Sequence, residues 1–284
     1  MTIHAKVSAA RLRLREAGIT PTESDLDARL LAQHVLGWTT ERFLTDARDP
    51  APDGFAPHYD ALVARRVTRE PLAYIVGTRE FWGLELEVTP DVLIPRPATE
   101  LIVEAMQELF PDRSLPLQIA DICTGCGCVA VALAHERPAA VISGRDISEP
   151  ALVVARRNAA RHGVADRVTF THGDLLDGLS GPFDAIVANP PYVIDRARPA
   201  LQPEVRNYEP YVALFGGVDG LTLVARLIEA APLRLRPGGY LIFEFGLGQD
   251  VEVEGLLENA PELTLVGLRR DLQAIARTAI AQRV

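Results

Sequence analysis

The stretch Leu117-Gln-Ile-Ala-Asp-Ile-Cys-Thr-Gly-Cys-Gly127 comes just before the apolar run Val129-Ala-Val-Ala-Leu-Ala134. Residues 117–121 predict a buried strand, and the apolar run predicts a helix over 129–136. The glycines between them permit a sharp turn and let the backbone approach a ligand closely. We therefore predict a ligand-binding turn between a strand and a helix.

A carboxylate follows this turn at Asp146, the end of the next predicted strand, 140–146. An acid there can accept hydrogen bonds from both hydroxyls of an adenosine ribose, as in dinucleotide enzymes and methyltransferases. The turn lacks the third glycine of the pyrophosphate-binding pattern. Asp121 would repel a diphosphate but attract the cationic ammonium of a methionine tail. The sequence therefore predicts S-adenosyl-L-methionine as cofactor and S-adenosyl-L-homocysteine as product. The alternative is a tight turn followed by an ordinary surface aspartate.

The tetrapeptide Asn189-Pro-Pro-Tyr192 directly follows a predicted strand, 183–188. Ligands of an open α/β sheet bind beyond the carboxyl ends of its strands, so the tetrapeptide should lie at the same edge as the glycine-containing turn. Its prolines stiffen the backbone and lack N–H donors. The Asn189 side-chain oxygen and the Pro190 carbonyl remain as acceptors, beside the ring and hydroxyl of Tyr192. The alternative is a rigid turn capped by asparagine.

These acceptors suit the methylation of a planar, conjugated nitrogen. The lone pair of an amide or of an exocyclic base amine is delocalised, and the amide rotation barrier of roughly 18–20 kcal/mol shows how strongly. Acceptors that hold both N–H bonds can keep the nitrogen partly pyramidal and aim its lone pair at a sulfonium methyl group. Good alignment can contribute about 7–11 kcal/mol more. We therefore predict an N-methyltransferase in which Asn189, Pro190 and Tyr192 are catalytic and Asn189, Pro190, Pro191 and Tyr192 bind the substrate.

From about residue 116 onward, predicted strands and helices alternate along the chain. That order implies a parallel sheet covered by helices on both faces, hence an α/β fold. Besides the elements already named, we expect strands at 168–171 and 239–244, helices at 99–109, 149–162, 221–233 and 251–258, and a closing strand pair at the C-terminus.

The first 75 residues have helical periodicity but no cluster of acids, bases or metal ligands, which indicates a packing or substrate-docking domain. After it, residues 81–89 alternate polar and apolar positions and predict a strand, with a return strand at 92–95. The predicted domains are 1–75, a hairpin linker at 76–98 and a catalytic domain at 99–284. The helices expected in the first domain are 7–16, 25–36 and 58–69.

Charge and cysteine content exclude several classes of function. The formal net charge of −9 at pH 7 disfavours wide contact with a nucleic-acid backbone, so we expect no stable nucleic-acid binding. The apolar runs are too short to span a bilayer, and we see no secretory signal. Cys123, Cys126 and Cys128 are the only cysteines. We expect small residues in a turn there, with neither a disulfide framework nor a metal site, and a cytoplasmic location.

Several further motifs lie outside the glycine-containing turn. They are Glu70-Pro-Leu-Ala-Tyr-Ile-Val-Gly77, Glu80-Phe-Trp-Gly83, Val92-Leu-Ile-Pro-Arg-Pro97 with Thr99-Glu100, Glu209-Pro210, Leu214-Phe-Gly-Gly217, Asp219-Gly-Leu221 and Pro237-Gly-Gly239. With Asn189-Pro-Pro-Tyr192, they make nearly the whole chain resemble the protein N5-glutamine methyltransferases (the HemK/PrmC family), which modify the Gly-Gly-Gln motif of bacterial peptide chain release factors. The Ile-Pro-Arg-Pro segment is far more specific than the tetrapeptide, since amino-methylating DNA enzymes also use an Asn-Pro-Pro-Tyr site but lack that segment.

This resemblance implies a small helical N-terminal domain, a hairpin linker and a Rossmann-like class I methyltransferase domain. It also implies a release factor, or another glutamine-containing protein, as the partner and methyl acceptor. The chain departs from the family pattern at Cys123, where glycine is usual, at Cys126, where serine or threonine is usual, and at Ala98, where an acid is expected. The expected cofactor-binding residues are Asp121, Cys123, Thr124, Gly125, Cys126, Gly127, Asp146, Ile147, Asp174, Leu175 and Asn189.

Some questions stay open at this stage. The acceptor could instead be a different protein glutamine, a small-molecule amide or amine, or an adenine of DNA or RNA, and the fold could also belong to a binding protein without turnover. Glu244 ends a predicted strand and could approach the active-site edge, but we expect it to be solvated. Arg96 either positions a carboxylate or a substrate backbone, or forms a structural ion pair.

Overall fold

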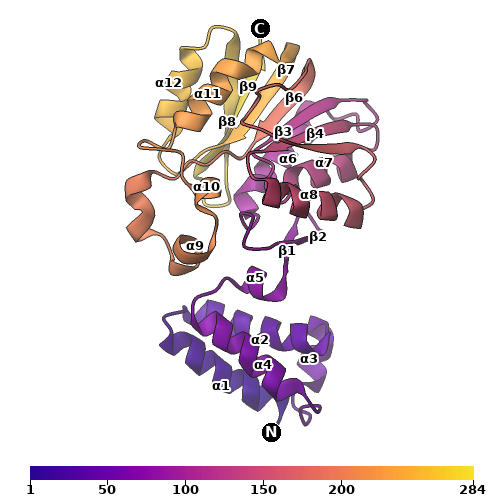
Figure 1. Cartoon of the computed structure of the whole chain (residues 1–284), viewed down its shortest axis with the longest axis vertical. Coiled ribbons are helices and arrows are strands. Elements are labelled where there is room, and N and C mark those ends of the chain that lie inside the picture. The colour runs from indigo at the N-terminus through magenta and orange to yellow at the C-terminus, as the bar shows by residue number, and fades with distance from the viewer. The chain divides into compact units, whose positions relative to one another are not determined.

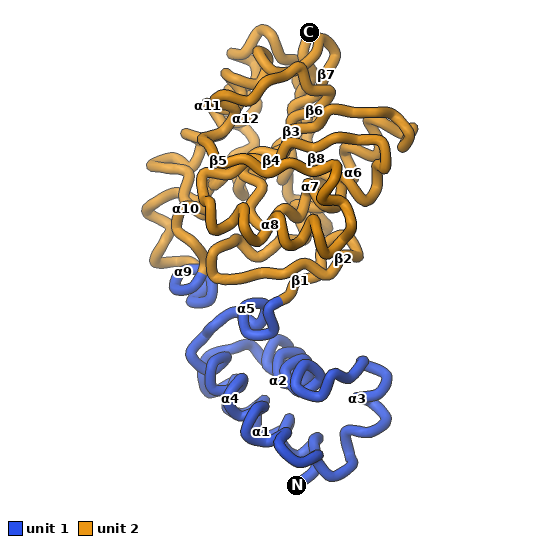
Figure 2. Tube along the Cα trace, turned by 45° about the vertical axis from the view of Figure 1, so that its right-hand side comes forward, with its two compact units in different colours: residues 1–77, 202–208 blue, residues 78–201, 209–284 orange.

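The computed structural model describes all 284 residues, which form two compact units (Figure 1). One comprises residues 1–77 together with 202–208, and the other comprises residues 78–201 together with 209–284, as the two colours of Figure 2 show. The membership of residues 202–208 in the first unit was not predicted from the sequence. None of the helices combines the length and the apolar character that crossing a bilayer requires.

The first unit is built from helices around its own apolar core. Leu14, Leu31 and Tyr59 are fully buried there, and each buried aliphatic side chain contributes about 1.5–3 kcal/mol. The helices expected from periodicity are present, whereas the short α3 and α5 were not predicted. The helices are α1 (Ile3–Glu16), α2 (Pro21–Leu36), α3 (Thr40–Asp46), α4 (Phe55–Val67), α5 (Leu72–Val76) and α9 (Pro203–Tyr208).

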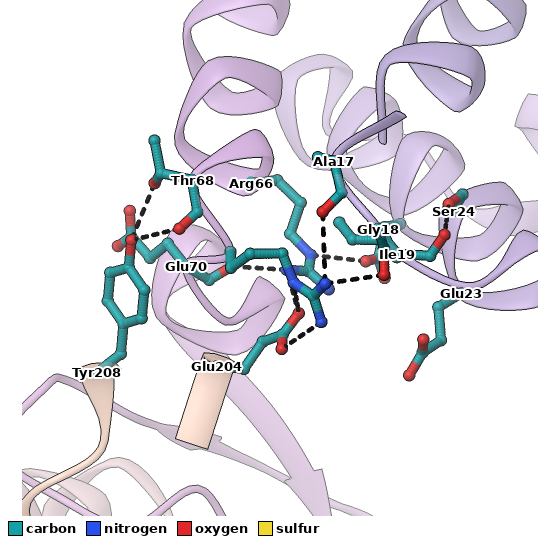
Figure 3. Close-up of polar contacts among 12 residues, drawn as sticks. Ala17, Gly18, Ile19, Glu23, Ser24, Arg66, Thr68, Glu70, Glu204 and Tyr208 are labelled. Carbon is teal, nitrogen blue, oxygen red and sulfur yellow. Dashed lines mark hydrogen bonds and ion pairs between the residues drawn. The ribbon is translucent and has the colours of Figure 1, made fainter. Parts of the chain in front are cut away.

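A cluster of ion pairs holds α9 in the first unit (Figure 3). The Glu204 carboxylate accepts hydrogen bonds from Arg66 Nη1 at 2.8 Å and from Arg69 Nε and Nη2 at 2.6 and 2.7 Å. Arg66 also donates through Nε to Asp27 at 2.7 Å. The Arg66 side chain is only 6% exposed, so the charges of this cluster are largely removed from water.

The second unit contains a seven-stranded sheet in the order β5-β4-β3-β6-β7-β9-β8. The first five strands in that order are parallel, and β9 runs antiparallel to both of its neighbours. The chain moves outward from β3 in one direction and then restarts at β6 on the other side, so a topological switch point lies between β3 and β6. The strands are β3 (Gln118–Ile122), β4 (Val141–Asp146), β5 (Val168–His172), β6 (Phe183–Ala188), β7 (Leu235–Glu244), β8 (Leu263–Arg270) and β9 (Ala276–Arg283).

Helices cover both faces of this sheet, which confirms the predicted α/β, Rossmann-like fold (Figure 1). Neighbouring strand residues such as Ile119 and Ala120 belong to opposite core clusters. One cluster includes residues of α6, α7 and α8, and the other includes residues of α11 and α12. The remaining elements are α6 (Glu100–Leu109), α7 (Cys128–Glu136), α8 (Glu149–Arg161), α10 (Tyr211–Leu214), α11 (Thr222–Ala230), α12 (Asp250–Glu258) and the 3₁₀ helices η1 (Pro97–Thr99), η2 (Asp195–Ala200) and η3 (Ala231–Leu233).

The hairpin lies earlier in the chain than predicted. Its strands are β1 (Thr78–Phe81) and β2 (Leu84–Glu87), and residues 92–95 form no return strand, so that prediction was wrong. The turn residues Trp82 and Gly83 have φ values of 54° and 71°, and two positive φ angles are typical of a tight two-residue hairpin turn. The alternation after Trp82 is real, but it belongs to the second strand of the pair.

Candidate active site

The glycine-containing turn between β3 and α7 has a backbone that few residue types can adopt. Cys123, Gly125 and Gly127 have φ values of 58°, 56° and 80°. A Cβ atom at Gly127 would lie 3.1 Å from Ala155 Cβ and 3.2 Å from Phe170 Cζ, closer than most real contacts. Cys123 keeps a positive φ without being glycine, at a cost of roughly 1–2 kcal/mol. Glycine adopts a positive φ without this cost, so a glycine at position 123 would fit the same turn.

Asp121 stands at the base of this turn and is 2% exposed. Its Oδ2 accepts hydrogen bonds from Thr124 Oγ1 at 2.5 Å and from the Ala130 backbone N–H at 3.1 Å. Burial, together with the charge of the nearby Asp146, raises the pKa of Asp121 to about 7, and these two donors oppose the shift. A cation bound beside Asp121 would favour its charged form.

Asp146 ends β4 with both carboxylate oxygens facing backbone donors. Oδ2 accepts from Gly125 N at 2.8 Å, and Oδ1 accepts from Ser148 N at 2.9 Å. Burial raises the pKa of Asp146, and these backbone hydrogen bonds oppose that shift. Each carboxylate oxygen has a second acceptor site, so the group is oriented by the turn and can still accept from a diol.

A cavity of about 330 Å³ joins these residues to the tetrapeptide. Its volume falls in the range of roughly 300–1,000 Å³ that is typical of small-molecule sites. It lies at the switch point of the sheet, where Asn189 follows β6 and Asp121 lies near the end of β3. Gly127, Pro190 and Tyr192 are outside the lining. The predicted site residues in the lining are Asp121, Cys123, Thr124, Gly125, Cys126, Asp146, Ile147, Asp174, Leu175, Asn189 and Pro191.

Close packing fixes the backbone of the tetrapeptide. A Cβ atom at Gly216 would lie 2.3 Å from the Pro191 carbonyl oxygen, and one at Gly220 would lie 2.2 Å from the Tyr192 carbonyl oxygen. Any side chain at these two glycines would force the backbone to move. Gln249 Nε2 also donates to the Tyr192 carbonyl oxygen at 3.1 Å. The Gly216 and Gly220 positions in the quoted motifs are therefore explained by contact with the tetrapeptide.

Glu244 is not solvated, and that prediction was wrong. It is 1% exposed, because β7 is an inner strand between β6 and β9 and its last residue is covered by other side chains. Oε1 accepts from the Tyr192 hydroxyl at 2.7 Å, and Oε2 accepts from Thr99 Oγ1 at 2.6 Å. Burial raises the pKa of Glu244, while the Thr99 and Tyr192 hydroxyls lower it. Burial likewise raises the pKa of the Tyr192 phenol.

Arg96 forms an ion pair with Glu209, a contact that fits both the positioning of a carboxylate and a structural role. Arg96 Nη2 lies 2.6 Å from Glu209 Oε1, and the Glu209 side chain is 1% exposed. The other oxygen of Glu209 accepts from the Ile94 backbone N–H at 3.4 Å. The Ile-Pro-Arg-Pro segment is therefore tied to the Glu209-Pro210 motif, beside the cavity that Pro95 lines.

Known proteins resemble this chain over nearly its whole length. A PrmC N-terminal domain model matches residues 7–77, and a methyltransferase small domain model matches residues 96–203. A release factor glutamine methyltransferase of Bradyrhizobium diazoefficiens is 41% identical over 274 residues, which cover 96% of this chain and 92% of that protein. One of Rhodospirillum rubrum is 42% identical over 95% of this chain and 82% of that protein. The chain belongs to the release factor glutamine methyltransferase family. The predictions of this family and of a methyltransferase are thereby confirmed.

The fold is also similar to that of a solved structure whose sequence is only distantly similar. The hMettl16 catalytic domain, solved in complex with MAT2A 3′UTR hairpin 1, aligns with a TM-score of 0.59 at 17% identity, over 89% of this chain and 90% of that one. At this identity the likeness concerns the fold alone.

Sequence reasoning missed two polar residues of this family member's site. Thr99 lines the cavity and, like Glu244, is buried, yet the two lie 145 residues apart in the chain. Thr99 was quoted only as part of a motif. The one available signal was the ionisable Glu244 at the end of an otherwise apolar strand, a position where a charge is rarely buried without a partner.

Proposed function

We propose that this chain transfers a methyl group from S-adenosylmethionine to the side-chain amide nitrogen of a protein glutamine, that of the Gly-Gly-Gln motif of a peptide chain release factor. One observation supports this most directly. Asn189 lines the same cavity as the carboxylates Asp121 and Asp146. The amide-holding group and the groups suited to the cofactor therefore face one enclosed space. The family relatives, named for release factor glutamine methylation, support the choice of acceptor.

The residues of the cavity fit S-adenosylmethionine by their chemistry. Asp146 can accept hydrogen bonds from a ribose diol, and the Asp121 carboxylate can hold an ammonium group. Apolar residues such as Ile147 and Leu175 line the same space and can pack against an adenine. When bound, the cofactor supplies a sulfonium methyl group as the electrophile.

The protein's own contribution is to position the acceptor. Asn189 Oδ1 and the Pro190 carbonyl can accept the two N–H bonds of a glutamine amide, and the rigid Pro190-Pro191 backbone keeps them in place. Held in this way, the nitrogen is partly pyramidal and presents its lone pair. Its proton becomes acidic only after methylation, so no strong general base is required beforehand. Catalysis therefore depends mainly on aligning the amide nitrogen with the methyl group.

The test is Asn189→Ala. Methyl transfer should fall by at least about 100-fold, because misplacing a reacting group by about 1 Å can already cost that much. The dissociation constant for S-adenosylmethionine, measured by titration calorimetry, should change by less than about threefold, since Asp121 and Asp146 are untouched.

Labelled-methyl transfer should be measured with an intact release factor and with one whose Gly-Gly-Gln glutamine is replaced by glutamate. The second lacks the amide and should accept no label. Small amides and adenine-containing nucleic acids are included as competing acceptors. Label on either of them in preference to the release factor, or undiminished turnover by Asn189→Ala, contradicts the proposal.

A further inference from the structure

A chain of three hydrogen bonds lies behind Asn189 and joins it to a buried carboxylate. Asn189 Nδ2 donates to Thr99 Oγ1 at 3.1 Å, and Thr99 Oγ1 donates to Glu244 Oε2 at 2.6 Å. The other oxygen of Glu244 accepts from the Tyr192 hydroxyl at 2.7 Å. Thr99 is at the end of η1, Glu244 ends β7, and Asn189 follows β6. Residues from three parts of the chain thus converge on the amide that faces the cavity.

The direction of this chain follows from which groups carry protons. Both hydroxyl-to-carboxylate distances are in the range of about 2.5–2.7 Å that is typical of an O–H donor and an ionised acceptor. An ionised carboxylate can only accept, so Thr99 must give its single hydroxyl proton to Glu244. Thr99 then has only lone pairs to offer, and Asn189 can meet it only with its NH₂ group. The Asn189 Oδ1 is left as the acceptor for a ligand in the cavity that Asn189 lines.

We propose that Glu244, acting through Thr99, sets the orientation of the Asn189 side-chain amide and so makes both residues positioning residues for methyl transfer. This inference rests on the proposed function, because it concerns the atom that would hold the acceptor amide. Asparagine alone does not fix which of its two terminal atoms faces the cavity, since the two differ little in shape. The carboxylate supplies the missing asymmetry.

Packing alone does not account for Glu244. A buried carboxylate loses its hydration, and an apolar residue of similar volume usually fills such a place with equal or greater stability. Two arginines, Arg96 and Arg277, favour its ionised form from a distance, and the Thr99 and Tyr192 hydroxyls bond to it directly. Each carboxylate oxygen of Glu244 therefore accepts one hydrogen bond. This is expected of a residue whose role is to accept hydrogen bonds at this position.

Thr99→Val and Thr99→Ser form a matched pair that tests the inference. Valine keeps the shape of threonine and removes the hydroxyl, so the Asn189 amide loses its anchor. We expect kcat to fall about 100-fold in Thr99→Val, the effect of misaligning a reacting group. Serine keeps the hydroxyl and should retain most of the wild-type kcat. The dissociation constant for S-adenosylmethionine should stay within about threefold of wild type in both variants.

Glu244→Gln tests the origin of the asymmetry. A glutamine can turn either its oxygen or its NH₂ group toward Thr99, and only the first arrangement keeps the native direction of the chain. We expect kcat to fall by about tenfold, a loss of the size that one hydrogen bond to a charged group accounts for. The KM of the acceptor should rise little by comparison.

Neutron crystal structures of the wild type, Thr99→Ser and Thr99→Val, which distinguish the NH₂ group of Asn189 from its oxygen, give a readout that does not depend on turnover. The Asn189 side chain should keep its orientation in the first two and rotate, or occupy two orientations, in the third. An unrotated Asn189 together with a wild-type kcat in Thr99→Val overturns the inference. If the wild type methylates a different acceptor, the proposed function fails, but the same comparison of kcat with that acceptor still decides the role of Thr99 and Glu244.

Discussion

Two glutamates, one in each compact unit, are largely removed from water and are held in opposite ways: the Glu204 side chain is 13% exposed and Glu244 is 1% exposed. Glu204 in the first unit is gripped by two guanidinium groups, Arg66 and Arg69, at 2.6–2.8 Å. Glu244 in the second unit is held by two neutral hydroxyls, those of Thr99 and Tyr192. Burial pushes the pKa of Glu204 upward, but the bonds from Arg69 and Arg66 outweigh it and leave the pKa lowered. Burial dominates at Glu244, whose pKa is raised.

The contrast indicates that the Glu204 carboxylate stabilises the folded protein when it is ionised, whereas the Glu244 carboxylate does not. A carboxylate whose pKa is lowered on folding contributes stability when it is ionised. One whose pKa is raised withdraws stability when it is ionised, and it is retained for another reason. At Glu244 that reason is the direction of the hydrogen bonds that reach Asn189. The same substitution, glutamate to glutamine, should therefore have opposite effects on stability at the two sites.

Glu204→Gln should give the largest change in stability. It leaves the buried Arg66 and the half-buried Arg69 without their shared counter-charge, and breaking a buried ion pair costs about 3–5 kcal/mol. We expect a loss at the lower end of that range in the free energy of unfolding. Urea unfolding can be followed through Trp38 fluorescence in a Trp82→Phe background, since these are the only tryptophans.

An exposed ion pair in the same unit provides the control. Asp25 pairs with Arg15 at 2.8 Å, and both side chains are more than 40% exposed. Asp25→Asn should change the free energy of unfolding by less than about 1 kcal/mol. Because folding lowers the pKa of Glu204, its contribution should be full above about 4.3, the ordinary value of a glutamate, and should be lost as pH falls from there through the lower folded pKa. Equal losses at Asp25 and Glu204 would show that the cluster is not the special feature of this unit.

Glu244→Gln should stabilise the protein while it slows methyl transfer. Replacing a buried ionic group often gains stability, and we expect up to about 1 kcal/mol at neutral pH. Since folding raises the pKa of Glu244, wild type should lose stability relative to Glu244→Gln as pH rises through that folded value. Thermal unfolding of the two proteins at a series of pH values measures this difference. A lower melting temperature for Glu244→Gln would assign Glu244 to the fold instead of the site.

Asp121 extends the comparison to a third buried carboxylate, and its expected effect is the smallest. With a pKa of about 7, it is close to half protonated at neutral pH. Binding a cationic ligand beside it should lower that pKa and release at most about half a proton per ligand at pH 7. Calorimetric titration with S-adenosylmethionine in buffers of different ionisation enthalpy measures the release. Asp121→Asn is the control, and an equal release by that variant would place the ammonium group elsewhere.

The elements that sequence predicted well are those set by neighbouring residues. The strand at 118–122, the positive-φ turn and the helix after it are encoded within one short stretch, while Asp146 ends β4 and Asn189 directly follows β6. Parallel strands then bring their ends together without further information. The class of fold could therefore be predicted, and most of the site residues predicted from the sequence do line the cavity.

The errors concern residues whose surroundings come from distant parts of the chain. Glu244 looks like a solvated strand end until β9 returns antiparallel beside β7 and Thr99 covers it. The hairpin was misplaced because its turn uses Trp82 in a conformation that is uncommon for a bulky residue. Nothing in the sequence around Glu204 indicates that it pairs with Arg66 and Arg69.

The assignment of 202–208 to the first unit means that the chain changes unit three times, after residues 77, 201 and 208. A protease that cuts within the hairpin would therefore yield two fragments that stay associated. Fragment 1–77 would keep α9 of the other fragment bound through Glu204. Expression of residues 1–77 alone would leave Arg66 and Arg69 facing a missing partner. The first unit is thus complete only in a polypeptide that extends beyond residue 77 to include residues 202–208.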